Sequence, residues 1–94
     1  MDTQPTSPAT SPIRVRVRAF AQLRELLDAG DFEVALPAGS TLVDLWECLR
    51  ERNRKIDALA SSTRLARNGR VAALPGEVLA DGDEVALLPP AGGG

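Results

Sequence analysis

A strict alternation of apolar and charged side chains begins at residue 13 and predicts the first β-strand. Its apolar and basic members are Ile13, Val15, Val17 and Ala19, alternating with Arg14, Arg16 and Arg18. Because successive side chains of a strand point to opposite faces, one face is expected to be buried and the other solvated. The arginine row (Arg14, Arg16 and Arg18) lies on the solvated face. It is interpreted either as a surface that discourages edge aggregation or as a docking surface for an acidic partner.

A short helical turn and a second strand are predicted next. Residues 20–27 fit a helical turn or loop against the core, and the turn signal Asp28-Ala29-Gly30 follows them. Phe32, Val34 and Leu36 then alternate with other residues up to Pro37, which ends the run. Since only a short connection separates the two strands, an antiparallel pair is the simplest arrangement.

The clearest predicted helix begins at Ser40 or Thr41. Thr41 and Asp44 have the spacing of a capping box, in which each side chain satisfies the other residue's backbone N–H. An apolar stripe with helical spacing follows: Leu42, Leu45, Trp46 and Leu49. This stripe should pack on the sheet. Cys48 flanks the stripe and is interpreted as a partly buried filler, since the chain has no histidine to activate it as a nucleophile.

The second half of the chain predicts a hairpin and a last strand. Asn68-Gly69 is a strong signal for a tight turn, because both central residues must reach positive φ. Residues 84–88 follow the turn Asp81-Gly82-Asp83 and are apolar on both faces, as in a central strand. Together the elements predict an α+β fold, a mixed sheet of about five strands packed on one main helix. The domain is expected over residues 13–88, after a disordered lead-in over residues 1–12.

Residues 89–94 form the tail, Pro89-Pro90-Ala91-Gly92-Gly93-Gly94, which contributes nothing to a core. Glycines lose much conformational entropy when they are ordered, so packing does not explain them after an apolar strand. The prolines stiffen the exit from the domain. Fully extended, the tail spans roughly 20 Å, enough to bring its terminal carboxylate into another protein's active site. Taken alone, these residues fit a frayed terminus equally well.

Composition narrows the function further. A net charge of −2 argues against a nucleic-acid binder, and no apolar run approaches the length of a membrane span. Lys55 is the only lysine among the 11 basic residues. With Cys48 as the only cysteine and no histidine, neither a disulfide nor a metal site is expected, and a reducing cytoplasm fits best. The lack of histidine and tyrosine also removes the commonest catalytic groups.

Three motifs, in this order and spacing, resemble the β-grasp, ubiquitin-like sulfur-carrier family, and most closely the small subunits of molybdopterin synthases. They are Phe20-Ala21-Gln22-Leu23-Arg24-Glu25, Asn68-Gly69, and Asp81-Gly82-Asp83-Glu84-Val85-Ala86-Leu87-Leu88-Pro89-Pro90 running into Gly93-Gly94. The resemblance covers residues 13–94 and implies the β-grasp fold. It favours a functional tail over a frayed terminus.

The resemblance implies that Gly94 is the reactive residue. A ubiquitin-activating-type adenylyltransferase would adenylate it with ATP, and a sulfur donor protein would convert it to a thiocarboxylate. The chain would bind no cofactor itself. It would act as a co-substrate of the synthase large subunit, in a heterotetramer, and give sulfur to a cyclic pterin monophosphate precursor in molybdenum cofactor biosynthesis.

The resemblance also assigns roles to other residues. Pro89, Pro90, Ala91, Gly92 and Gly93 would form the partner-binding tail, and the arginine row with Phe20 is the candidate docking face. Ala91-Gly92 departs from the family, which tends to have a larger apolar residue first, so less area is expected to be buried at the tail's base. Sulfur carriers for thiamine thiazole or cysteine biosynthesis, a ubiquitin-like modifier and a plain interaction module remain alternatives; the Phe20 segment and Pro89-Pro90 favour the molybdopterin assignment over the other carriers.

Overall fold

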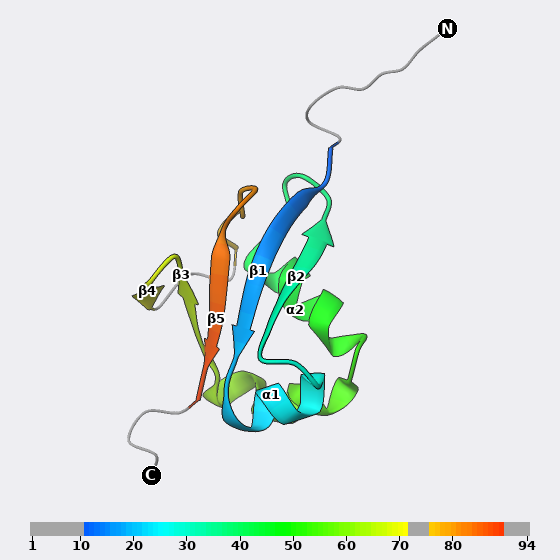
Figure 1. The fold of residues 1–94 in the computed structure, drawn as a ribbon, viewed down its shortest axis with the longest axis vertical. Helices are drawn as coiled ribbons and strands as arrows, with labels where there is room; N and C mark the ends of the chain where they lie inside the picture. Colours follow the sequence, from blue (N-terminus) through cyan, green and yellow to red (C-terminus); the bar gives the residue numbers. More distant parts are fainter. Residues whose placement is uncertain (1–10, 72–75, 90–94) are drawn as a thin grey trace, which may run out of the picture.

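Two parallel strands at the centre of the sheet organise the fold. The computed structural model describes residues 11–71 and 76–89, and in it β1 (Ile13–Ala19) pairs in parallel with β5 (Glu84–Leu88). β2 (Asp31–Leu36) lies antiparallel on the other side of β1. β3 (Arg64–Arg67) and β4 (Arg70–Val71) complete the order β2-β1-β5-β3-β4. The predicted mixed sheet of five strands is confirmed (Figure 1).

The main helix, α2 (Leu42–Arg50), covers one face of this sheet (Figure 1). Leu42, Leu45 and Leu49 are buried with the apolar side chains of β1, whereas Trp46 is half-buried. The capping box is confirmed, because Asp44 N–H donates to Thr41 Oγ1 at 3.3 Å and Thr41 N–H donates to Asp44 Oδ2 at 2.9 Å. The opposite face of the sheet carries no helix among the described residues and is called the open face below.

Two further helical segments close the end of the core. α1 (Ala21–Leu27) follows β1 directly and buries Leu23 and Leu27, as the sequence predicted for a helical turn. The 3₁₀ helix η2 (Arg54–Ser62) buries Ile56. Asn53 links the two segments, since its side-chain amide donates to the Leu26 carbonyl at 3.1 Å. No helix of the described residues is long and apolar enough to cross a membrane.

The hairpin between β3 and β4 turns at Asn68-Gly69 as predicted. Asn68 and Gly69 have φ values of 50° and 84°, the left-handed region that a two-residue turn of this kind requires. Asn68 also completes the ladder beyond β3. Its backbone N–H donates to the Glu84 carbonyl and its side-chain oxygen accepts from the Glu84 N–H, both at 2.8 Å. The hairpin is thereby tied to the start of β5.

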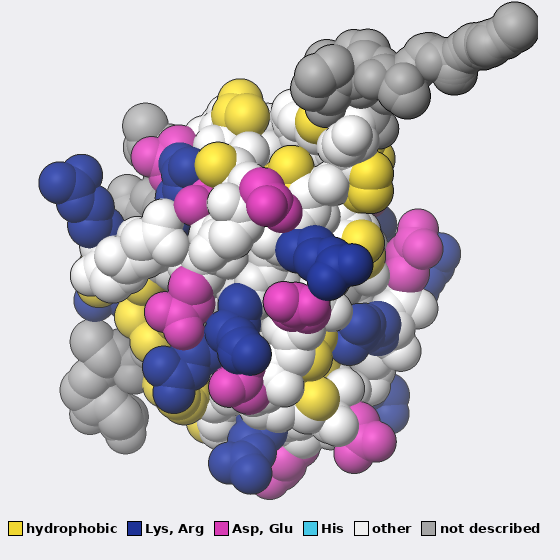
Figure 2. All heavy atoms as spheres, turned by 45° about the horizontal axis from the view of Figure 1, so that its top comes forward, with side chains coloured by type: hydrophobic (Ala, Val, Ile, Leu, Met, Phe, Trp, Pro, Cys, Tyr) yellow, Lys and Arg dark blue, Asp and Glu magenta, His cyan; other side chains and the backbone are white. Residues whose placement is uncertain are grey.

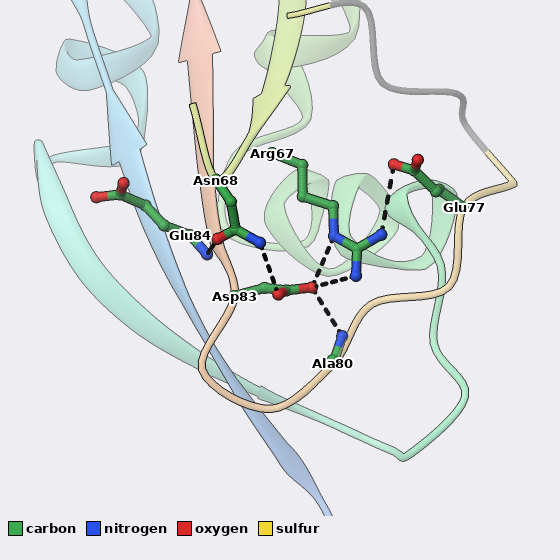
Figure 3. A network of polar contacts seen from close by, with 6 residues as sticks. All are labelled: Arg67, Asn68, Glu77, Ala80, Asp83 and Glu84. Carbon is green, nitrogen blue, oxygen red and sulfur yellow. Dashed lines mark hydrogen bonds and ion pairs between the residues drawn. The ribbon is translucent and has the colours of Figure 1, made fainter. Parts of the chain in front are cut away.

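A network of ion pairs and hydrogen bonds around Asp83 holds the beginning of β5 (Figure 3). Arg67 contacts the Asp83 carboxylate through two nitrogens at 2.8 Å, and Asn68 donates to its other oxygen at 2.9 Å. The Ala80 N–H donates to the same carboxylate at 2.8 Å. Glu77 lies 3.5 Å from Arg67 on the opposite side. The network therefore joins β3, the turn before β5 and the segment that precedes it.

The same network sets the ionisation of Asp83. Burial by itself raises the pKa of this carboxyl, but the hydrogen bonds from Ala80 and Asn68 and the charge of Arg67 outweigh burial, and the pKa lies below its ordinary value. A carboxyl with a lowered pKa in the folded state stabilises the fold above its unfolded-state pKa. That contribution is lost as the pH falls through the folded-state pKa.

We expect Asp83→Asn to lower the free energy of unfolding at pH 7 by about 1 to 3 kcal/mol, because the half-buried Arg67 loses its closest anionic partner. The difference between wild type and variant should shrink as the pH falls below about 4, where Asp83 of the unfolded chain takes up a proton, and it should be lost below the lower folded-state pKa. Urea denaturation at several pH values measures both effects. Asp28→Asn is the matched control, since Asp28 is exposed at a left-handed position that asparagine also tolerates. A difference that stays constant down to pH 2.5 would contradict the assignment.

Candidate functional site

Pro89, the first residue of the predicted tail, follows β5 at the end of the sheet where β1 also ends (Figure 1). Ala19, the last residue of β1, pairs with Leu87, so Phe20 and Pro89 leave neighbouring strands at the same edge. Pro89 is exposed. The other predicted tail residues, Pro90, Ala91, Gly92, Gly93 and Gly94, lie outside the described residues. The parallel pairing thus determines where the predicted reactive end of the chain begins.

A sharp corner at Phe20-Ala21 lies beside this exit. Phe20 is extended and its carbonyl accepts hydrogen bonds from the N–H groups of Leu23 and Arg24, at 3.2 and 3.4 Å, which begins α1 without an intervening loop. Ala21 has a φ of 54°, a left-handed conformation that is unfavourable for a residue with a Cβ. The Phe20 side chain is 37% exposed, and the Arg18 guanidinium carbon lies 5.9 Å from its ring centroid.

A small cavity of about 70 Å³ lies between this corner and the end of η2. Its walls include Phe20, Ala21, Leu59, Thr63 and Pro89. The η2 wall is fixed by hydrogen bonds, because the Thr63 hydroxyl donates to the Leu59 carbonyl at 2.6 Å. We define the tail exit as Phe20, Ala21, Leu59, Thr63 and Pro89. The sequence predicted a role for Phe20 and Pro89 but not for the other three residues, since no local pattern marks a left-handed alanine or a cavity wall from a distant segment.

The arginine row lies on the open face, as the alternation predicted, but two of its members have acidic partners. Arg16 is 3.4 Å from Asp31 of β2, and Arg18 is 3.7 Å from Glu84 of β5. Basic and acidic side chains are intermixed on the face that Figure 2 shows. Exposed pairs of this kind add little stability, but they reduce the net positive charge that the row presents to a partner.

An apolar strip lies beside the arginine row on the open face. Register places Ala86 opposite Ala66, which in turn pairs with Val71, so these side chains share a face. Leu88 lies on the same face, opposite Arg64, and is half-buried. Val71 is 49% exposed. We call Ala66, which is itself buried, Val71, Ala86 and Leu88 the open-face strip; it crosses β4 and β3 and follows β5 toward the tail exit.

Neither of the two described groups with shifted pKa values, Asp57 and Asp83, lines the cavity at the tail exit. The hydrogen bond from the Trp46 indole lowers the pKa of Asp57, and Arg50 adds to this effect against some desolvation. That cluster joins α2 to η2, and the Asp83 network lies at the opposite end of β5 from Pro89. Cys48 is half-buried on α2, as predicted. The tail exit as defined contains no carboxylate, amine or thiol, and its one hydroxyl, that of Thr63, donates to the Leu59 carbonyl.

The fold is the ubiquitin-like β-grasp, the fold that the sequence motifs predicted. The ThiS family matches residues 17–94, and the chain belongs to this family.

Relatives and solved structures agree with this assignment. The chain is 34% identical over 98 residues to a molybdopterin synthase sulfur carrier subunit from Arabidopsis thaliana. The alignment covers 98% of this chain and 95% of that relative. A protein named as molybdopterin converting factor, subunit 1, from Pyrococcus furiosus matches with a TM-score of 0.75 and 31% identity over 84% of this chain and 99% of its own.

Two further structures are similar. Small archaeal modifier protein 1 from Haloferax volcanii matches with a TM-score of 0.74 and 28% identity over 84% of this chain and 99% of its own. A complex of subunits 1 and 2 of the molybdopterin-converting factor from Helicobacter pylori contains a chain that matches with a TM-score of 0.63 and 26% identity, over 87% of this chain and 100% of that one.

We expect Ala21→Gly to raise the free energy of unfolding by about 0.5 to 1 kcal/mol, because glycine adopts positive φ without the steric cost of a Cβ, a gain that its greater chain entropy only partly offsets. Urea denaturation should show a higher midpoint with an unchanged slope. Ala35→Gly is the matched control. Ala35 is exposed within β2, so the same replacement there should destabilise the fold by about 0.5 to 1 kcal/mol. Equal losses at both positions would contradict a strained Ala21.

Proposed function

We propose that this chain is the sulfur-carrier small subunit of a molybdopterin synthase and that the Gly94 carboxylate carries the sulfur as a thiocarboxylate. The main support for the proposal is the ThiS-family domain itself. Its central strand β5 leads directly into the tail, at the end of the sheet where β1 also ends. The identity to the curated Arabidopsis carrier over nearly the whole chain supports the molybdopterin pathway over the other carriers. A cytoplasmic location stays a prediction.

The proposed chemistry requires little from this chain beyond an accessible carboxylate. A Gly94 carboxylate oxygen attacks the α-phosphorus of ATP on an adenylyltransferase, pyrophosphate leaves, and an acyl-adenylate forms. Sulfur from a donor protein then attacks the carbonyl carbon and AMP leaves, because the adenylate is a much better leaving group than the original oxygen. With a cysteine persulfide as the donor, the product is an acyl disulfide; a thiol then attacks the donor's cysteine sulfur, forms a disulfide with it and releases the terminal thiocarboxylate. Glycines before it place no Cβ in a narrow channel of the accepting enzyme.

A large subunit is the proposed receiver of the tail. The Helicobacter pylori structure is a complex of two subunits of molybdopterin-converting factor, and one of them matches this chain. The open-face strip is the proposed contact, since it is apolar and runs along β5 to the tail exit. The arginine row is a secondary part of the same docking face, because Arg16 and Arg18 are already paired with carboxylates.

A protein modifier is the second candidate. The similarity to small archaeal modifier protein 1 favours it, and activation of the terminal carboxylate is common to both functions. The two differ in the nucleophile that receives the activated carbonyl, sulfur for a carrier and a lysine amine for a modifier. The product therefore distinguishes them.

We expect intact-mass analysis of the untagged protein from its native host to show a species in which one terminal oxygen of Gly94 is replaced by sulfur. Deletion of Gly93-Gly94 should abolish this species and sulfur transfer to the pterin precursor. The same deletion should leave the urea midpoint unchanged, because glycines have no side chains to bury in a core. Carboxylate alone, with activating enzyme, ATP and sulfur donor present, would refute the proposal. Amide-linked conjugates to lysines of other proteins would favour the modifier.

We expect Ala86→Glu, at the centre of the open-face strip, to weaken binding to the large subunit at least about tenfold, because a charge would then be desolvated within an apolar contact. Reversing Arg14, Arg16 and Arg18 together should weaken binding by a smaller factor. Isothermal titration calorimetry measures both. Glu51→Gln is the control, since Glu51 is the C-cap residue of α2, which covers the other face of the sheet. If Ala86→Glu leaves the affinity unchanged, the strip is a solvated surface.

A further inference from the structure

The strained corner beside the tail exit is not explained by core packing. Ala21 is exposed, so its left-handed backbone is not forced by burial of its own side chain. Its effect is geometric. The chain turns from β1 into α1 within one residue. Phe20 therefore stays next to the end of β1, 37% exposed, whereas a longer loop would place it farther from the sheet. Unfavourable backbone conformations persist where the surrounding structure holds them, and they gather at functional sites.

This corner fixes the position of the Phe20 ring next to Pro89. Both residues line the same cavity of about 70 Å³, and the parallel register brings their strands out of the sheet side by side. The guanidinium of Arg18 lies 5.9 Å from the ring centroid. The other wall is equally fixed, since Thr63 and Ser62 hydroxyls both donate to the Leu59 carbonyl. The first residue of the tail therefore lies between two walls that are held independently.

We propose that Phe20 is a positioning residue, whose ring limits the directions in which the chain can continue beyond Pro89. This inference rests on the proposed function and deepens it, because it assigns to Phe20 a role distinct from docking. A docking contact stabilises the bound carrier and its reacting form equally, so its loss raises KM. A positioning contact acts on the placement of the reacting carboxylate, so its loss lowers kcat.

The test compares variants of the full-length carrier in ATP–pyrophosphate exchange with its adenylyltransferase, varying carrier concentration. Phe20→Ala should lower kcat about tenfold and change KM less than about twofold, since small misplacements of a reacting group have large rate effects. Phe20→Tyr keeps the ring and should restore kcat to within about twofold of wild type. A raised KM with unchanged kcat, or no change in either, overturns the proposal.

Two controls separate positioning from folding. Val43→Ala removes an exposed apolar side chain from α2, on the helix layer, and should leave both constants unchanged. Circular dichroism checks that Phe20→Ala is folded under assay conditions. If it is not, Phe20→Leu replaces it, with kcat expected to fall about threefold and KM to stay unchanged. A kcat equal to wild type in that folded variant overturns the proposal.

A second measurement does not depend on the enzyme. In the nuclear magnetic resonance spectrum of the wild-type chain, cross-relaxation between the Phe20 ring protons and the Pro89 ring protons is expected, and its absence overturns the proposal. This arm also keeps the two hypotheses distinguishable. If the adenylyltransferase does not activate the wild-type chain, the proposed function is refuted, and the Phe20–Pro89 contact alone then decides the positioning inference. If the wild type is activated and Phe20→Ala has the same kcat, only the positioning inference is refuted.

Discussion

The parallel pairing of β1 with β5 is the constraint on which the rest of the structure depends. Residues about 70 positions apart in sequence must meet in register, and parallel pairs form only after the intervening chain has crossed over. The turn before β5 extends the pairing, because Gly82 N–H donates to the Arg14 carbonyl and Arg16 N–H donates to the Asp83 carbonyl, both at 2.8 Å. The Asp83 network then fastens this turn to the hairpin (Figure 3). These contacts fix the position of the first residues of β5. Because β5 is a short strand, they also fix the place where it ends.

The two faces of the sheet have different roles. One face buries β1, β5 and α2 against each other, so that Val17, Leu49 and Val85 are fully inaccessible to solvent. The other combines neutralised charges with the open-face strip. A stable core on one side leaves the second side free to vary its surface chemistry, since removing exposed contacts there costs the fold little. A carrier that must be released by one enzyme and received by another benefits from such a face, because a contact of moderate strength can be remade with each partner.

Local signals in the sequence predicted most of the fold, for physical reasons that particular residues show. Asn68-Gly69 and Thr41 with Asp44 specify a turn and a helix start through nearest neighbours alone, and both are confirmed. The 3₁₀ character of η2, the ring of contacts around Asp83 and the pairing of Arg16 with Asp31 depend on segments brought together only by folding. Ala21 is the clearest case, because alanine favours ordinary helical φ and nothing nearby indicates otherwise. For the site, the sequence indicated Phe20 and Pro89 but not the cavity between them.

The proposed function explains why strain at Ala21 would be retained while catalytic groups are absent from the described exit. A chain that only presents its terminus contributes to the rate through orientation, and orientation requires a rigid base close to the point where the chain leaves the domain. Glycines near the end of the tail work against such rigidity, since each adds conformations that the accepting enzyme must exclude. A fixed wall at the first residue of the tail reduces the number of these conformations before binding, at the cost of a strained residue. Phe20 and Ala21 together fit that requirement, because the aromatic side chain forms the wall and the left-handed backbone keeps it at the exit.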